Sequence, residues 1–230
     1  MSNPIEHILL REKEIIRLIK LINKSGLQHI IVGGYAVATI MKRFSVDLDI
    51  AIKNIDKEKF EEILKKEEYS ISYSKEVSTI YGENFIRFEK KISGLPISVD
   101  FLINGLVSRT TNASWSFDYI KENSEIRNLE TLQMPVPTKE LLIAMKLHSG
   151  RISDTRDIVA LSKDISIIKI LGHSKRGEIE KLKKNASSSL EYLKSKNFKD
   201  SFQGVFGIKA YNEELIKNAE EMLNAIIATE

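Results

Sequence analysis

The segment from His29 to Lys53 constrains the fold of this chain more than any other part of its sequence. The β-branched run Ile30–Val32 predicts a strand, Gly33-Gly34 predicts a turn, and the apolar segment Tyr35–Arg43 predicts a helix. Glycine adopts backbone conformations that other residues avoid and lets a ligand approach closely. The turn, followed by free N–H groups at a helix start, is therefore a candidate phosphate site.

The next segment predicts a strand that carries two aspartates. In Asp47–Ile52, Leu, Ile and Ile alternate with Asp47, Asp49 and Ala51, so both carboxylates project from one face. Carboxylates roughly 7 Å apart along a strand repel each other unless a positive charge lies between them. Mg²⁺ prefers such oxygen ligands together with substrate phosphates, and two such ions can activate an attacking oxygen and stabilise a leaving one. An Asp-x-Asp pair alone is more often solvated, but after a Gly-Gly turn and one helix it predicts phosphoryl or nucleotidyl transfer.

A third aspartate lies in an apolar stretch farther along the chain. Further strands are predicted at Tyr69–Tyr73, Val77–Tyr81, Phe85–Lys91 and Ile97–Ile103. They favour a mixed or antiparallel extension of the sheet. Asp100 lies in the last of these strands, and an ionised carboxylate is costly to bury without a partner. Either a metal ion or a structural ion pair with Arg87 would supply that partner.

Composition narrows the kinds of site and partner that the chain can have. With 42% hydrophobic residues among 230, it can bury a sizeable core as one domain or two small ones. The sequence has no cysteine and only four scattered histidines, so a bound metal would be held by oxygen. No apolar run approaches the ~20 residues of a membrane span, and the charged, amphipathic start does not look like a signal peptide. We therefore expect a cytoplasmic protein without membrane contact.

The distribution of charge leaves nucleic-acid binding open. The formal net charge is +3, and the segment from His173 to Lys199 holds eight Lys or Arg against three Glu. A basic helical face there could contact nucleic acid. A solvated, lysine-rich surface explains the same residues at least as well, because only Tyr192 and Phe198 are available to stack on bases.

A domain boundary is predicted at Gln133–Thr138, where two prolines favour an extended linker and Thr138 can cap the next helix. Residues 1–135 would form the first domain and residues 136–230 a helical second domain. In the second domain, Lys146 lies on the flank of the first helix and Asp157 lies in the next helix. Without further information, Lys146 would be a solvated lysine and Asp157 a capping-box partner of Asp154.

These motifs, in this order, resemble those of the polymerase-beta-like nucleotidyltransferase superfamily, and within it most the AbiEii-type toxin group. The resemblance rests on Gly33-Gly34 followed by Arg43-x-Ser45-x-Asp47-Leu48-Asp49, and more weakly on Lys146 to Arg151 followed by Arg156-Asp157. It implies an α/β nucleotidyltransferase fold, in which a mixed β-sheet flanked by helices is joined to a helical C-terminal lobe that closes over the nucleotide.

The resemblance also implies roles for individual residues. Asp47, Asp49 and Asp100 would be the catalytic metal ligands, holding two Mg²⁺ ions with Mn²⁺ as a substitute, and Asp100 would help to activate the attacking hydroxyl. Lys146 would act in catalysis by contacting the nucleotide phosphates. The implied nucleotide-binding residues are Gly33, Gly34, Arg43, Ser45, Lys146, Arg151 and Asp157.

The implied activity is transfer of a nucleotidyl group from a nucleoside triphosphate to a hydroxyl, with pyrophosphate as the leaving group. The acceptor would be RNA, including tRNA, or a protein. The biological role would be that of a toxin in a toxin–antitoxin or phage-defence system, with a cognate antitoxin as partner.

Two other functions remain open from the sequence. The superfamily often has Gly-Ser where this chain has Gly33-Gly34, so a hydroxyl that could contact phosphate is missing. One alternative is a nucleotidyltransferase that modifies a small molecule such as an aminoglycoside, and the other is a non-catalytic binding or regulatory member of the fold. Three intact aspartates argue against the non-catalytic alternative.

Overall fold

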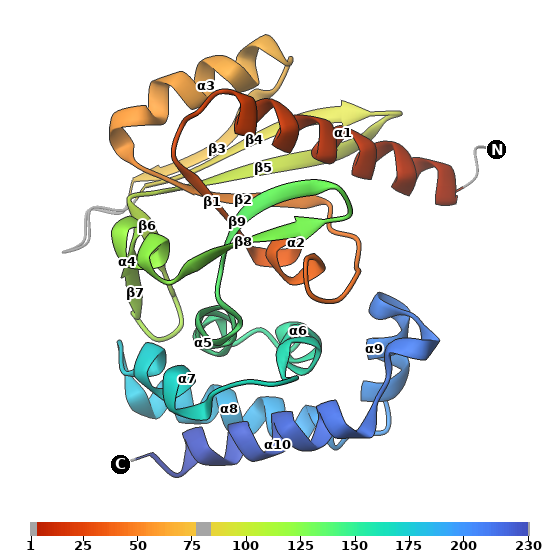
Figure 1. Ribbon diagram of the computed structural model, residues 1–230, viewed down its shortest axis with the longest axis vertical. Coiled ribbons are helices and arrows are strands. Elements are labelled where there is room, and N and C mark those ends of the chain that lie inside the picture. Colours follow the sequence, from red (N-terminus) through yellow and green to blue (C-terminus); the bar gives the residue numbers. More distant parts are fainter. Residues whose placement is uncertain (1–3, 77–83, 230) are drawn as a thin grey trace. The chain divides into compact units, whose positions relative to one another are not determined.

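The structure is a computed structural model that describes residues 4–76 and 84–229 (Figure 1). Its helices are α1 (Pro4–Lys24), α2 (Gly33–Ala38), α3 (Lys57–Lys66), α4 (Phe117–Glu122), α5 (Lys139–Ser149), α6 (Asp154–Leu161), α7 (Ile167–Ser174), α8 (Ile179–Leu193), α9 (Phe198–Phe206) and α10 (Glu213–Ile227), with 3-10 turns η1 (Asn54–Asp56) and η2 (Ile208–Ala210). Its strands are β1 (His29–Val32), β2 (Asp47–Ile52), β3 (Ser70–Glu76), β4 (Asn84–Ile92), β5 (Leu95–Ile103), β6 (Gly105–Val107), β7 (Ser114–Ser116), β8 (Ser124–Leu129) and β9 (Leu132–Pro137). The predicted strand Val77–Tyr81 lies outside the described residues.

Contacts along the chain define two compact units. The first unit contains residues 1–39, 44–106 and 115–137, and the second contains residues 40–43, 107–114 and 138–230. The chain passes from the first unit to the second for the last time between Pro137 and Thr138. The second unit also includes two short segments from the first half of the chain, residues 40–43 and 107–114. The domains predicted from the sequence, 1–135 and 136–230, remain a prediction.

The first unit is built on a five-stranded sheet in the order β1-β2-β5-β4-β3. β1 runs antiparallel to β2, β2 parallel to β5, and β5 antiparallel to β4, which pairs antiparallel with β3. The predicted mixed sheet is therefore confirmed. β8 and β9 form a separate antiparallel hairpin, so the two prolines predicted to lie in an extended linker belong to strand β9.

The core of the first unit lies between the sheet and the helices α1 and α3, which cover one of its faces (Figure 1). The apolar stripe of α1 and its sheet partners are almost fully buried: Ile15, Leu18, Ile19, Ile22, Leu48, Ile50, Val99 and Phe101. The ring of Phe60 from α3 meets that of Phe101 edge to face, with 5.6 Å between centroids. Because side chains alternate along a strand, the same packing leaves the polar positions of β2 and β5 on the other face.

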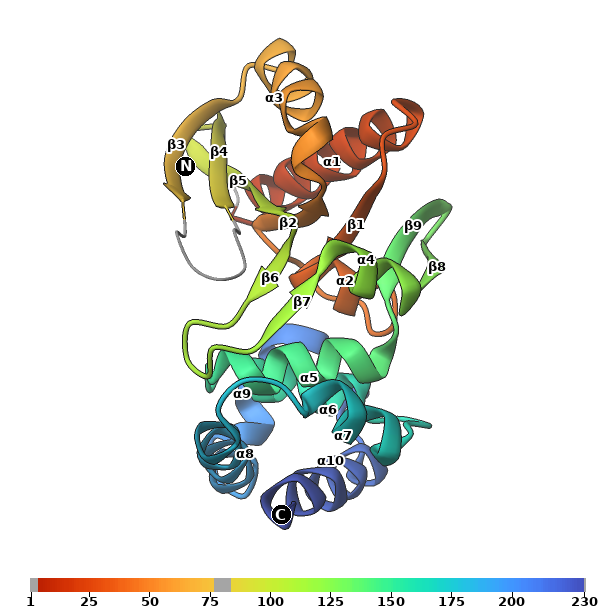
Figure 2. The same ribbon diagram turned by 90° about the vertical axis from the view of Figure 1, so that its left-hand side faces the viewer.

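The second unit is helical, and Figure 2 shows α8 and α10 side by side. α8 runs without a break from Ile179 to Leu193, with Ala186 and Ser189 buried. The basic segment from His173 to Lys199 includes α8, and its contact with nucleic acid remains a prediction. Lys181 and Lys183 of α8 form ion pairs with the glutamates three residues earlier.

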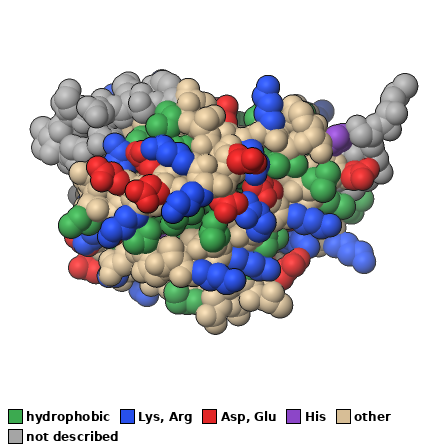
Figure 3. Space-filling view, turned by 90° about the horizontal axis from the view of Figure 1, so that it is seen from above, with side chains coloured by type: hydrophobic (Ala, Val, Ile, Leu, Met, Phe, Trp, Pro, Cys, Tyr) green, Lys and Arg blue, Asp and Glu red, His purple; other side chains and the backbone are tan. Residues whose placement is uncertain are grey.

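The described helices include none that is both long enough and apolar enough to cross a membrane. In the view of Figure 3, basic and acidic side chains are interspersed over the surface. Ion pairs such as Arg17–Glu67 and Lys59–Asp56 join residues of opposite sign on the first unit. Exposed ion pairs of this kind add little to the free energy of unfolding, but they keep positive and negative charges mixed on the surface.

Candidate active site

The three predicted metal ligands lie on adjacent strands of the first unit. Asp49 of β2 is paired in register with Asp100 of β5, so their side chains leave the same face of the sheet. Asp47 precedes Asp49 by two residues and projects from that face as well. Parallel pairing of β2 with β5 therefore brings together carboxylates that are about fifty positions apart in the sequence.

Gly33 gives the carboxylate of Asp49 its space. Gly33 has a φ of +63°, a conformation that side chains disfavour, and a Cβ there would lie 1.9 Å from Oδ2 of Asp49. Gly33 and Gly34 are also the first residues of α2, so the predicted helix Tyr35–Arg43 is wrong at both ends. The close approach that Gly33 permits is, in this structure, an approach to Asp49. Phosphate binding by the two glycines remains a prediction.

Asp100 is held by an arginine from the neighbouring strand. Arg87 of β4 is paired in register with Asp100, and its Nε and Nη2 donate to the two carboxylate oxygens at 2.7 and 2.6 Å. Asp100 is 3% exposed. Burial raises its pKa, and the nearby Asp47 adds to this, whereas Arg87 opposes the rise. The ion pair that the sequence offered as an alternative partner is therefore present, and metal binding by Asp100 remains a prediction.

Asp47 is oriented by hydroxyl groups on either side of it. The Oγ atom of Ser98, two residues before Asp100 on β5, donates a hydrogen bond to Oδ1 of Asp47. Oγ of Ser45 donates to the backbone oxygen of Asp47 at 3.2 Å, and the Tyr35 hydroxyl donates to the Ser45 carbonyl at 3.0 Å. Ser45 thus shapes the start of β2, and its predicted contact with nucleotide is untested.

The donor set on this face fits a hard divalent cation in part. Asp47 and Asp49 offer carboxylate oxygens, the ligands with which Mg²⁺ commonly combines substrate phosphates. In the part of the chain that the structure describes, no three His, Cys, Asp or Glu side chains are already grouped around one point as metal ligands. Asp100 points both oxygens at Arg87. On this face, Asp47 and Asp49 are therefore the carboxylates that could hold an ion, whereas both oxygens of Asp100 are bound by Arg87.

The predicted phosphate-binding lysine lies in a buried charge cluster of the second unit. Lys146 of α5 is only 7% exposed, so it is not a solvated lysine. Its Nζ donates to Asp154 and Asp157 of α6, at 2.7 Å each. Burial by itself lowers the pKa of Lys146, but the two aspartates outweigh burial and raise it. Asp154 and Asp157 therefore both bind Lys146. The capping-box alternative is wrong, because Asp154 lies inside α6 and the N-cap residue is Ser153, which makes no side-chain capping hydrogen bond.

Two arginines complete this cluster. Arg43 forms an ion pair with Asp157, and its guanidinium lies 6.0 Å from the ring centre of Phe206. Arg151 donates to Asp154 at 2.8 and 3.2 Å. Burial raises the pKa of Asp154, but Lys146 and Arg151 outweigh it, so the pKa lies below its usual value. The cluster joins three cations to two carboxylates.

The structure thus divides the predicted site residues into two groups. The first unit contains Gly33, Gly34, Ser45, Asp47, Asp49 and Asp100, and the second contains Arg43, Lys146, Arg151 and Asp157. Sequence analysis missed Ser98 as a partner of Asp47 and Asp154 as a partner of Lys146. The period of two along β5 places Ser98 on the face of Asp100, but its contact with Asp47 depends on the register between β2 and β5.

No family model and no curated protein matches the chain. Among solved structures, it is similar to an H. pylori protein described as a candidate nucleotidyltransferase, with 18% identity over 99% of this chain and 96% of that one and a TM-score of 0.47. It is also similar to the antibiotic-resistance factor ANT(2'')-Ia, with 13% identity over 70% and 90% of the two chains and a TM-score of 0.48. An antigenic nucleotidyltransferase-like protein from Paracoccidioides brasiliensis gives 12% identity over 84% and 92% and a TM-score of 0.48. With identities this low and TM-scores below 0.5, these likenesses do not establish a family for the chain.

Proposed function

We propose that the protein is a metal-dependent nucleotidyltransferase whose active site is the aspartate-bearing face of β2 and β5. The observation that carries the proposal is the pairing of Asp49 with Asp100, with Asp47 two residues away on the same face. A group of carboxylates this close is unfavourable unless cations compensate it, and Arg87 is positioned to compensate Asp100. The motif resemblance of Gly33-Gly34 and Arg43 to Asp49 supports the same function.

In the proposed reaction, an acceptor hydroxyl attacks the α-phosphorus of a nucleoside triphosphate. The new P–O bond forms as the bond between the α-phosphorus and its bridging oxygen breaks, and pyrophosphate leaves. Two bound Mg²⁺ ions, or Mn²⁺ in their place, would supply charge stabilisation at the attacking and leaving oxygens. Asp47 and Asp49 would hold the ions, with Ser98 fixing the orientation of Asp47. Asp100, once released by Arg87, would accept the hydroxyl proton.

For the acceptor and the biological role, we propose an RNA such as tRNA, in the manner of a toxin of the AbiEii type with a cognate antitoxin. Only the motif resemblance supports this part of the proposal. A protein or a small molecule could react at the same aspartate-bearing face, so experiment must identify the acceptor.

The experiment incubates the protein with Mg²⁺ or Mn²⁺, each of four α-labelled nucleoside triphosphates, and total RNA, a cell protein extract or an aminoglycoside. Label should appear in RNA. Asp49→Asn should abolish transfer and weaken Mn²⁺ binding, with thermal stability unchanged or raised because like-charge repulsion is relieved. Asp118→Asn is the matched control, since this aspartate is 66% exposed on its side chain and pairs with Lys53.

The outcomes separate the alternatives. Label in the protein or aminoglycoside fraction would support the proposed nucleotidyltransferase activity but would identify a different acceptor. A wild-type protein that binds no Mn²⁺ in the presence of nucleotide, and labels none of the fractions, would rule out the proposed enzyme.

A further inference from the structure

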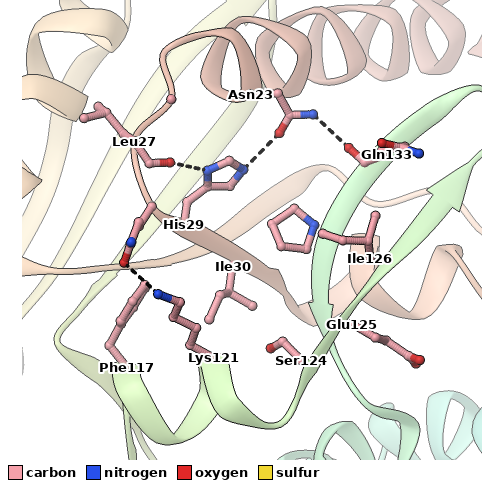
Figure 4. Close-up of a pocket in the computed structure, with 13 residues that line it drawn as sticks. Asn23, Leu27, His29, Ile30, Phe117, Lys121, Ser124, Glu125, Ile126 and Gln133 are labelled. Atoms are coloured by element: carbon pink, nitrogen blue, oxygen red, sulfur yellow. Dashed lines mark hydrogen bonds between the residues drawn. The ribbon is translucent and has the colours of Figure 1, made fainter.

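A pocket of about 590 Å³ lies in the first unit, lined by the end of α1, the start of β1, α4 and the β8–β9 hairpin (Figure 4). Polar side chains on its wall bind one another: Lys121 donates to Gln28 at 3.1 Å, and Nε2 of His29 lies 3.0 Å from Oδ1 of Asn23. Asn23 also donates to the Gln133 carbonyl at 2.8 Å. These hydrogen bonds join neighbouring elements, so the pocket by itself does not indicate a ligand.

Arg87 differs from these side chains, because it is a cation on the face that we propose as the active site. It alternates along β4 with Phe85 and Glu89, and its register partner is Asp100. The hydrogen bond to Asp100 raises the pKa of Arg87, whereas burial lowers it. The nearby charges of Asp47 and Glu89 raise it further. Arg87 therefore stays charged among several carboxylates.

Arg87 and Asp100 differ in how easily each can leave their ion pair. Nε and Nη2 of Arg87 bind the two carboxylate oxygens, so Nη1 takes no part in the pair. The side chain of Arg87 is 36% exposed and that of Asp100 is 5% exposed. A buried carboxylate needs a positive partner, whereas water can solvate a partly exposed guanidinium. Arg87 is therefore the partner that can move.

Phe85 gives the guanidinium a second contact on the same face. The central carbon of the guanidinium lies 5.9 Å from the centre of the Phe85 ring, as in a cation–π interaction. A guanidinium can stack on an aromatic ring and also donate two hydrogen bonds to a phosphate. Contact with Phe85 would therefore favour a position beside the aspartates even after Arg87 had left Asp100.

A divalent ion bound by Asp100 would compete with Arg87. Each carboxylate oxygen can accept more than one partner, so Arg87 does not exclude an ion by geometry alone. Two cations on one carboxylate nevertheless repel each other, and this repulsion is stronger near a protein surface than in bulk water. The binding of an ion to Asp100 and the Arg87–Asp100 pair should therefore weaken each other, and the effect is reciprocal.

We infer that Arg87 is a phosphate-binding residue of the proposed active site, which pairs with Asp100 in this structure and donates to a substrate phosphate once another cation compensates Asp100. This inference rests on the proposed function. The phosphate belongs either to the nucleoside triphosphate or to the backbone of an RNA acceptor, because a guanidinium recognises the same group in both.

The first test measures the binding of inorganic triphosphate by calorimetry in buffer without divalent cations. Asp100→Asn removes the charge that holds Arg87 and should raise the affinity about tenfold, the effect of one charge-assisted hydrogen-bonded contact. Asp47→Asn is the matched control, because it removes a charge from the same face but leaves Arg87 on Asp100, so it should raise the affinity less. Adding Arg87→Met to Asp100→Asn should abolish the gain.

A short oligouridylate in the same assay distinguishes the two sources of phosphate. If Arg87 binds the nucleotide, Asp100→Asn should strengthen the binding of triphosphate more than that of the oligonucleotide. If Arg87 binds the RNA backbone, the larger gain should appear with the oligonucleotide, and Arg87→Met should remove it. Either result supports Arg87 as a phosphate-binding residue and assigns its substrate.

The second test measures Mn²⁺ affinity by electron paramagnetic resonance, which does not depend on activity. Arg87→Met should bind Mn²⁺ about three- to tenfold more tightly than the wild type, because the competing cation is gone. In the Asp100→Asn background, the same substitution should have a smaller effect. Arg17→Met is the matched control, since Arg17 pairs with Glu14 and Glu67 and its helix α1 covers the other face of the sheet (Figure 1). It should leave both affinities unchanged.

Arg87→Lys serves if Arg87→Met does not fold. It keeps a positive charge beside Asp100 but lacks the planar fork, so Mn²⁺ affinity should stay near that of the wild type while phosphate binding weakens.

The outcomes separate this inference from the proposed function. An Arg87→Met protein that binds Mn²⁺ and triphosphate as the wild type does, or binds both more weakly, would overturn the inference. An Asp100→Asn protein that gains no more affinity for either phosphate probe than Asp47→Asn does would also overturn it. A wild-type protein that binds no Mn²⁺ in the presence of nucleotide would contradict the proposed function itself, and the inference with it.

Discussion

At the scale of single residues, the candidate site depends on one missing side chain. Gly33 is required for two reasons: its φ is positive, and Asp49 occupies the space that a side chain would need. The two requirements can be separated experimentally, because Gly94 has a φ of +80° but a Cβ added there would have open space within 4 Å.

We predict that Gly33→Ala is more damaging than Gly94→Ala. Both substitutions force alanine into the left-handed region, at a cost of about 1–2 kcal/mol. Only Gly33→Ala must also displace the Asp49 carboxylate, so its free energy of unfolding should fall by about 1 kcal/mol more and its Mn²⁺ affinity should weaken. Urea denaturation and Mn²⁺ titration measure the two effects. If the free energy of unfolding fell equally in both variants, displacing the Asp49 carboxylate would cost no stability, and the prediction would be wrong.

At the scale of elements, strand register decides which charges meet. Asp100 pairs with Asp49 across one edge of β5 and with Arg87 across the other, so the same register that gathers carboxylates also supplies the compensating cation. The two partners differ in exposure, since the side chain of Arg87 is 36% exposed and that of Asp100 is 5% exposed. Removing Arg87 leaves a buried carboxylate without its partner, whereas removing the Asp100 charge leaves a partly exposed guanidinium without its partner.

We predict that Arg87→Met destabilises the protein more than Asp100→Asn does. Arg87→Met leaves a buried carboxylate without its partner and should cost about 2 kcal/mol, below the ~3–5 kcal/mol of a fully buried pair because Arg87 is partly solvated. Asp100→Asn leaves an arginine that water can reach and should cost less than about 1 kcal/mol. Denaturant unfolding at pH 7 provides the comparison. A larger loss for Asp100→Asn would indicate that Arg87, not Asp100, is the group that depends on the pair.

At the scale of the whole molecule, the predicted catalytic residues belong to two units with different kinds of charge. The carboxylates of the first unit lie on a sheet face, whereas Lys146 of the second unit is enclosed by Asp154 and Asp157. Because Lys146 is buried and bound to two carboxylates, we expect it to contribute to the stability of the fold. Its predicted contact with nucleotide phosphates can be tested against that role.

We predict that Lys146→Met lowers the free energy of unfolding by about 3–5 kcal/mol, because two buried aspartates lose a shared partner. For a chain of this size the melting temperature should fall by roughly 10 °C, at about 2–4 °C per kcal/mol. Lys184→Met, at an exposed position of α8, is the control and should change little. If Lys146→Met kept its melting temperature and lost only nucleotide use, the phosphate-binding role predicted from the sequence would be supported instead.

The sequence by itself determined the local elements that carry the candidate site. The period of two in Asp47–Ile52 and Ile97–Ile103 placed all three aspartates opposite the apolar positions, because alternation along a strand depends only on the backbone. The residues of α1 that are buried, Ile15, Leu18, Ile19 and Ile22, likewise recur at the spacing of one helix face. The tertiary structure alone decided which residues meet: Asp49 with Gly33, Asp47 with Ser98, and Lys146 with Asp154 and Asp157. Such pairings depend on strand register and helix packing between distant segments, and local periodicity contains no information about either.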